Sequence, residues 1–131
     1  MKVLKFGGTS VKDASRIAKV RDIVAETLKE HKKVVVVVSA LGGLTDVLIG
    51  AAKNAEAGDD TFKDVIEDIS YRHRKAADQL FSVEEMKGFR GYLRNTTKNL
   101  ENLLFGTSLI KELSPRSLDR VMSYGEIMSS Y

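Results

Sequence analysis

Residues 32–46 read KKVVVVVSALGGLTD, and the five consecutive valines, Val34–Val38, decide the fold class. A run of β-branched residues without polar alternation predicts a strand that is buried on both faces, as the strands of a parallel sheet are. Upstream, Lys2–Phe6 is a second strand candidate. Between the two strands, apolar residues recur at spacings of three and four: Ile17, Val20, Val24 and Leu28. This spacing predicts an amphipathic helix within residues 13–31. Strand, helix and strand form a βαβ unit, so the sequence predicts an α/β fold.

Downstream of the valines the signals are helical. Thr45 or Asp46 is a candidate N-cap for a helix that runs to about Ala57. The residues Gly58-Asp59-Asp60 are typical of a turn, and a second helix is predicted from Thr61 to Phe81.

Two further helices are predicted near the C-terminus. Ser82 with Glu85 three residues later forms a capping box, and we expect the helix that follows to end near Phe105, with Gly106 as its stop. Ser114-Pro115 predicts the start of the next helix, with proline in its first turn.

Composition excludes several classes of function. The chain has 131 residues, 43% of them hydrophobic and 30% charged, which fits one globular domain. Its net charge of +3 is spread along the chain, so we expect no nucleic-acid partner. There is no cysteine, and the two histidines, His31 and His73, are too far apart for an HExxH motif. Because no apolar run is long enough to cross a bilayer, we expect no membrane partner and a cytoplasmic location.

The N-terminal stretch MKVLKFGGTS, residues 1–10, has the residue types of a phosphate site. It places an ammonium group, Lys5, and unhindered backbone N–H donors at Gly7 and Gly8 near the carboxyl edge of a parallel sheet. Thr9 and Ser10 add hydroxyl groups. The same residues also fit a simple tight turn with Lys5 extended to solvent. Neither GxxxxGK[ST] nor GxGxxG is present.

Two other segments carry candidate site residues. Ser39-Ala40-Leu41-Gly42-Gly43-Leu44-Thr45-Asp46 is a second small-residue turn after a strand, and its simpler interpretation is that Thr45 and Asp46 only cap a helix. Ser123-Tyr124-Gly125-Glu126 places a carboxylate beside a glycine, although a lone glutamate on a helix is usually solvated.

Together, KFGGTSV, VVVVSALGGLTD and SPRSLDRVMSYGEIMSS resemble aspartokinase, of the amino-acid kinase family. The resemblance implies a doubly wound, mainly parallel αβα sandwich. It also implies transfer of the ATP γ-phosphoryl group to the side-chain carboxylate of L-aspartate, giving 4-phospho-L-aspartate in the synthesis of lysine, threonine and methionine.

The resemblance also assigns roles to the motif residues. Lys5 is expected to be catalytic by neutralising the transferring phosphoryl group, within an ATP phosphate site that also contains Gly7, Gly8, Thr9 and Ser10. Ser39 and Thr45 are expected to line the aspartate pocket, and Glu126 to pair with the substrate α-ammonium group. Mg²⁺ is expected to bind through the ATP phosphates without a dedicated protein metal site.

The resemblance runs from the first residue to the last but matches only the N-terminal part of an aspartokinase domain. It therefore implies that the ATP-binding second half and the regulatory modules are absent, and that the isolated chain is inactive. Whether the parent is fused to homoserine dehydrogenase stays open, and we expect the parent to be a homo-oligomer. Two alternatives remain: a non-catalytic anion-binding or interaction fragment, and a related amino-acid kinase with another substrate.

Overall fold

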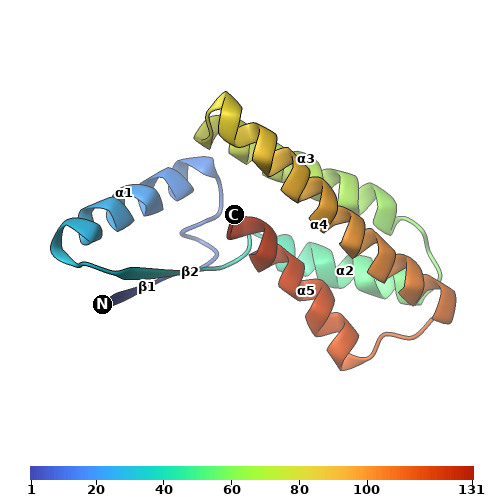
Figure 1. Ribbon diagram of the computed structural model, residues 1–131. Coiled ribbons are helices and arrows are strands. Elements are labelled where there is room, and N and C mark those ends of the chain that lie inside the picture. The colour runs from blue at the N-terminus through green and yellow to red at the C-terminus, as the bar shows by residue number, and fades with distance from the viewer.

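The computed structural model describes all residues, 1–131, as a small sheet with one helix and a group of four packed helices (Figure 1). The elements, in chain order, are β1 (Lys2–Phe6), α1 (Ala14–Glu30), β2 (Val34–Val38), α2 (Leu44–Glu56), α3 (Phe62–Leu80), α4 (Val83–Ile110) and α5 (Pro115–Ser129).

The two strands form the predicted βαβ unit. β1 and β2 pair in parallel, with Lys5 opposite Val37 and Phe6 opposite Val38, and α1 is the crossover helix. Asp13 caps α1, because its carboxylate accepts a hydrogen bond from the Arg16 backbone N–H at 3.0 Å. The predicted α/β class is confirmed, and the chain is richer in helix than in strand.

The prediction that Val34–Val38 is buried on both faces is wrong for this chain. Val35, Val36 and Val37 are 45%, 40% and 45% exposed. The sheet contains two strands, and α1 is the helix that packs along β2. The other helices bury their apolar sides against one another and not against the sheet. A two-stranded sheet with one packed helix therefore leaves the valines partly exposed, whereas a parallel sheet with helices on both faces would bury them.

The hydrophobic core lies among α2, α3, α4 and α5, and extends into the loop before α2 at Ala40 and Leu41. The largest fully buried side chains all come from these four helices: Phe62, Leu44, Leu48, Ile69, Leu93, Leu100, Leu104, Met128 and Val121. This packing fixes the loop that follows β2 against the helices.

Two predicted helix boundaries are wrong. α2 begins at Leu44 after Gly43, whose φ of 74° is left-handed, so neither Thr45 nor Asp46 is the N-cap and both lie in the first turn. α4 continues through Gly106 and ends at Ile110, and its C-cap is Lys111, which has a φ of 53°. A glycine inside a helix lowers the free energy of unfolding by about 1 kcal/mol relative to alanine. Burial of Leu104 and Thr107 on either side of Gly106 outweighs this loss, so the helix continues.

The predicted starts of α4 and α5 are confirmed. The Ser82 backbone N–H donates to the Glu85 carboxylate at 2.7 Å, and the Glu85 N–H donates to the Ser82 hydroxyl, which is the predicted capping box. Ser114 caps α5 by accepting from the Ser117 N–H, with Pro115 in the first turn.

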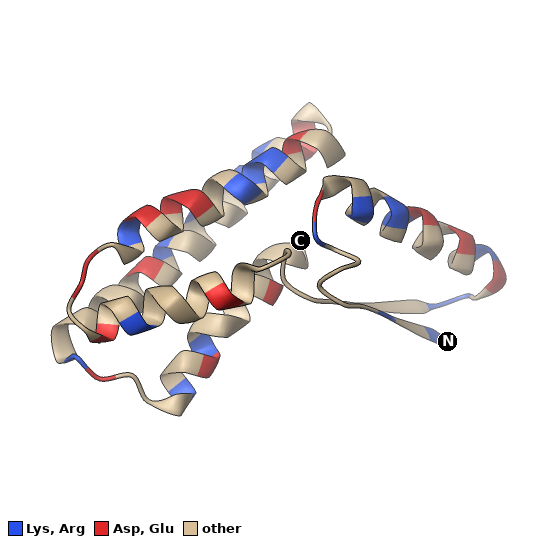
Figure 2. Ribbon diagram, turned by 180° about the vertical axis from the view of Figure 1, so that it is seen from behind, with Lys and Arg blue, Asp and Glu red and all other residues tan.

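Figure 2 shows basic and acidic residues mixed along α1 and α3. None of the helices combines the length and the apolar character that a membrane span requires.

Candidate functional site

The loops that follow β1 and β2 lie side by side at the carboxyl edge of the sheet. The Ser39 N–H donates to the Phe6 carbonyl at 3.1 Å. A Cβ atom placed on Gly8 would lie 4.0 Å from the Ala40 carbonyl oxygen. The parallel pairing of the strands thus brings the first two sequence motifs together.

An open cleft of about 640 Å³ lies at this edge. Three parts of the chain line it: the loop after β1, the loop after β2 with the first turn of α2, and α5. Its lining residues are Gly8, Thr9, Lys12, Ser39, Ala40, Leu41, Gly42, Gly43, Thr45, Asp46 and Glu126.

Five of the predicted site residues line this cleft. They come from all three motifs: Gly8, Thr9, Ser39, Thr45 and Glu126.

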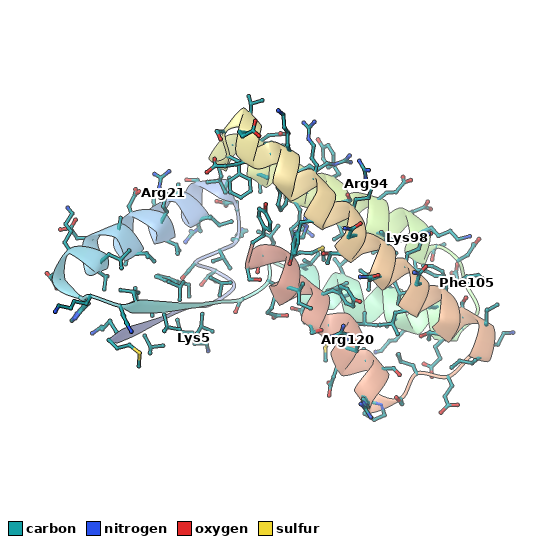
Figure 3. The ribbon with its side chains drawn as sticks, in the orientation of Figure 1. Lys5, Arg21, Arg94, Lys98, Phe105 and Arg120 are labelled. Carbon is teal, nitrogen blue, oxygen red and sulfur yellow. The ribbon has the colours of Figure 1, made fainter.

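Lys5, Gly7 and Ser10 are not among the residues that line the cleft. Gly7 and Ser10 form a turn in which the Ser10 N–H donates to the Gly7 carbonyl at 2.9 Å. Lys5 lies inside β1 rather than at its end, and its exposed side chain lies on the sheet face opposite α1 (Figure 3). Alternation along the strand gives this direction, because the neighbouring Leu4 and Phe6 are the half-buried residues of β1.

Gly125 determines how α5 reaches the cleft. A Cβ atom at this position would lie 2.7 Å from the Ala40 Cβ, so only glycine permits the observed approach of α5 to the loop after β2. The next residue, Glu126, is therefore held at the rim of the cleft. Its carboxylate forms no ion pair within the chain, which leaves it free for a cationic group of a ligand.

The first turn of α2 offers backbone donors to an anion. The N–H groups of Thr45 and Asp46 donate to no acceptor in the chain. A helix N-terminus carries about half a positive charge, and Lys12 adds a full one at the same cleft. The opposite charges come from Asp46 and Glu126, so the cleft can bind a ligand that carries both an anionic and a cationic group.

Comparison with known proteins identifies the family. The model of the amino acid kinase family matches residues 1–131. The chain belongs to the amino acid kinase family.

Proteins similar to this chain include aspartokinases. Aspartokinase 3, chloroplastic, of Arabidopsis thaliana is 37% identical over 131 residues, which cover 98% of this chain and 22% of that protein. The bifunctional aspartokinase/homoserine dehydrogenase 2, chloroplastic, of the same plant is 30% identical over 128 residues, covering 98% of this chain and 14% of that protein. The chain thus spans about a quarter or less of the length of these relatives.

A solved amino acid kinase has the same fold. E. coli aspartokinase III in complex with lysine and aspartate superposes with a TM-score of 0.79 and 28% identity, over 99% of this chain and 27% of the other. The same enzyme in complex with aspartate and ADP gives the same TM-score at 27% identity. The helix-rich arrangement is therefore part of an amino-acid kinase fold.

In this member of the amino acid kinase family, sequence reasoning missed two charged residues of the cleft, Lys12 and Asp46. Lys12 follows the Gly7-Gly8-Thr9-Ser10 turn within the same loop, and this position is the feature of the sequence that indicates a cation at the site. Its side chain packs on Gly42, where an added Cβ atom would lie 2.6 Å from the Lys12 Cγ. The sequence predicts Asp46 only as a candidate helix cap, whereas Gly43 occupies the cap position.

Proposed function

We propose that this chain supplies the aspartate-binding side of an aspartate kinase site, together with part of its phosphate-binding side. The observation that carries the proposal is that all three motifs meet at one cleft with anionic and cationic groups. The relatives named aspartokinases, and the solved aspartokinase that contains aspartate and ADP, support the same assignment.

The cleft residues suit an amino acid with a second carboxylate. Glu126 is placed to pair with the α-ammonium group, a charge-assisted contact that a plain dicarboxylate lacks. Ser39, Thr45 and the free N–H groups at the start of α2 are placed to bind carboxylate oxygens.

Phosphoryl transfer to this substrate needs no general base, because the aspartate side chain is already ionised at neutral pH. A carboxylate oxygen forms a bond to the γ-phosphorus of ATP, the bond to the β–γ bridging oxygen breaks, and ADP leaves. The chain's contribution is to position the reactants and to stabilise the developing charge. We propose that Gly8, Thr9 and Lys12, which line the cleft, serve this purpose. Lys5 does not line the cleft, and the proposal that it acts on the transferring group rests on the resemblance of KFGGTS to aspartokinase.

Mg²⁺, bound through the ATP phosphates, would neutralise part of their negative charge. No three acidic or histidine residues gather into a metal site, and Asp46 and Glu126 are the carboxylates that line the cleft. These residues fit an ion that is bound mainly through phosphate oxygens.

The test separates this proposal from its alternatives. Isotope-labelled chain is titrated with L-aspartate, L-glutamate and succinate, and the amide signals of Ser39, Thr45 and Glu126 are followed by NMR. We expect aspartate to bind at least tenfold more tightly than succinate, because loss of a charge pair costs a few kcal/mol. Equal binding of glutamate supports a kinase with another substrate, and binding of succinate and aspartate alike supports a simple anion site.

Activity is measured on the whole protein. Aspartate-dependent ADP release is followed, and hydroxylamine traps the acyl phosphate as the hydroxamate. Absence of the hydroxamate with active release of ADP would exclude 4-phospho-L-aspartate as the product.

A further inference from the structure

The loop after β2, residues 39–43, is held at both ends by side chains that do not line the cleft. The Arg72 guanidinium of α3 donates to the Gly42 carbonyl at 2.6 Å, and the Ser129 hydroxyl of α5 donates to the Ser39 carbonyl at 2.6 Å. Arg72 and Ser129 are both absent from the cleft lining. These two bonds, which we call the loop clamp, join segments that are 30 and 90 residues apart in sequence.

The loop clamp determines where two backbone N–H groups point. In a trans peptide the carbonyl and the following N–H point in opposite directions, and the chain contains no cis peptide. Fixing the Ser39 carbonyl on α5 therefore fixes the Ala40 N–H, and fixing the Gly42 carbonyl on α3 fixes the Gly43 N–H. Ala40 and Gly43 both line the cleft, and neither N–H donates to an acceptor within the chain.

The sequence of the loop explains why the Gly42 carbonyl needs a strong partner. Gly42 and Gly43 are adjacent glycines, and the peptide between them has little intrinsic preference for one orientation. Arg72 is half-buried and forms no ion pair, so its guanidinium is available to the carbonyl, and hydrogen bonds from a charged donor are stronger than neutral ones.

We propose that Arg72 and Ser129 are positioning residues that hold the loop after β2 in its ligand-binding geometry. They act through the Gly43 and Ala40 N–H groups and do not touch the ligand. The identity of that ligand rests on the proposed function, whereas the loop clamp itself is testable without any ligand.

The first experiment observes the loop directly. Amide NMR spectra of the 131-residue chain are compared for Arg72→Met and Ser129→Ala, with Arg72→Lys and Ser129→Thr as conservative variants. Arg74→Met, an exposed residue of the same helix, and Ser130→Ala, whose hydroxyl bonds within α5, are the matched controls. We expect the Gly43 signal to move in Arg72→Met and the Ala40 signal in Ser129→Ala, with partial return in the conservative variants.

The second experiment measures function in the same variants. We expect Arg72→Met to weaken aspartate binding about tenfold or more, because the Gly43 N–H then loses its fixed orientation and must be ordered when the ligand binds. The KM for aspartate of the whole protein should rise while the urea midpoint stays near that of the controls.

The outcomes are separable. Gly43 and Ala40 signals that move no more than in the controls would overturn the loop clamp, and the conservative variants decide this even where Arg72→Met fails to fold. Displaced signals with unchanged aspartate affinity would overturn the positioning role. If the unmodified chain binds no aspartate, the proposed function fails, while the amide signals still decide whether the clamp exists.

Discussion

Replacement of Gly125 by alanine tests the close approach of α5 to the loop after β2. The added Cβ would lie 2.7 Å from the Ala40 Cβ and 3.4 Å from the Leu48 Cδ1. The Leu48 atom ends a flexible side chain, whereas the Ala40 Cβ is attached directly to the backbone and moves only with the loop. An ordinary carbon–carbon contact is about 3.5–4.0 Å, so α5 and the loop must separate by about 1 Å.

The free energy of unfolding then has two opposing contributions. Overpacking of this kind costs about 1–3 kcal/mol, and alanine in place of glycine in a helix gains about 1 kcal/mol. We therefore expect Gly125→Ala to be neutral or to lose up to about 2 kcal/mol of stability. Gly91→Ala is the matched control, because Gly91 lies in α4 with nothing within 4 Å of an added Cβ. It should gain about 1 kcal/mol.

Urea unfolding followed by circular dichroism measures both variants against the unmodified chain. The difference between the two variants in the free energy of unfolding separates overpacking from helix propensity, and we expect this difference to be about 1–3 kcal/mol. The shift should also displace Glu126 and lengthen the bond from Ser129 to Ser39, so aspartate binding should weaken in Gly125→Ala and not in Gly91→Ala. Equal gains of stability in the two variants would refute the reasoning, because α5 would then have room that the structure denies it.

Three further predictions concern single side chains. Glu126→Gln should raise the KM for aspartate about tenfold or more and leave the KM for ATP nearly unchanged, because it removes only the partner of the substrate ammonium group. A rise in both KM values would indicate a structural role. Lys5→Ala should lower kcat by about two orders of magnitude or more, and a kcat within about twofold of the original would remove Lys5 from the catalytic residues. Burial lowers the pKa of His73 from 6.5, the bond from its Nδ1 to the Ile69 carbonyl opposes this and the charge of Arg72 adds to it. As the pH falls, His73 therefore takes up its proton in the unfolded chain before it does so in the folded chain. The free energy of unfolding should be highest above pH 6.5 and should decrease as the pH drops below 6.5 toward the lowered pKa. A His73→Leu variant with the same pH dependence would contradict this.

Local signals in the sequence predicted the elements well. The valine run, the apolar spacing of α1 and the reciprocal bonds of Ser82 and Glu85 each act within a few residues, so their structure follows from the sequence alone. The exposure of the valines and the length of α4 depend on which other elements cover them. Burial across the fold is not encoded in a short window, and both of these predictions failed. The N-cap predicted for α2 failed as well, because Gly43 takes that position.

The site shows the same division. The positions of Gly8, Thr9 and Ser39 follow from the rule that parallel strands end at one edge of a sheet. Glu126 reaches the cleft because Gly125 packs on Ala40, a contact between segments far apart in the sequence. The position of Lys12 at the cleft depends on the path of the loop after β1. The direction of the Lys5 side chain depends on alternation along β1. The motif itself specifies neither.

The distribution of the core makes the two sides of the cleft unequal in local stability. Ile17 is the residue of α1 that packs against the core of α2–α5, and neither strand contributes a core side chain. We therefore expect β1, α1 and β2 to open at a lower free energy than the four helices, and their amide hydrogens to exchange sooner. The loop after β1 belongs to this less stable part, while Thr45 and Glu126 belong to the helices. A ligand that bridges the cleft stabilises the closed form according to its concentration and affinity, so binding should slow hydrogen exchange most in β1 and α1, at a distance from the ligand itself.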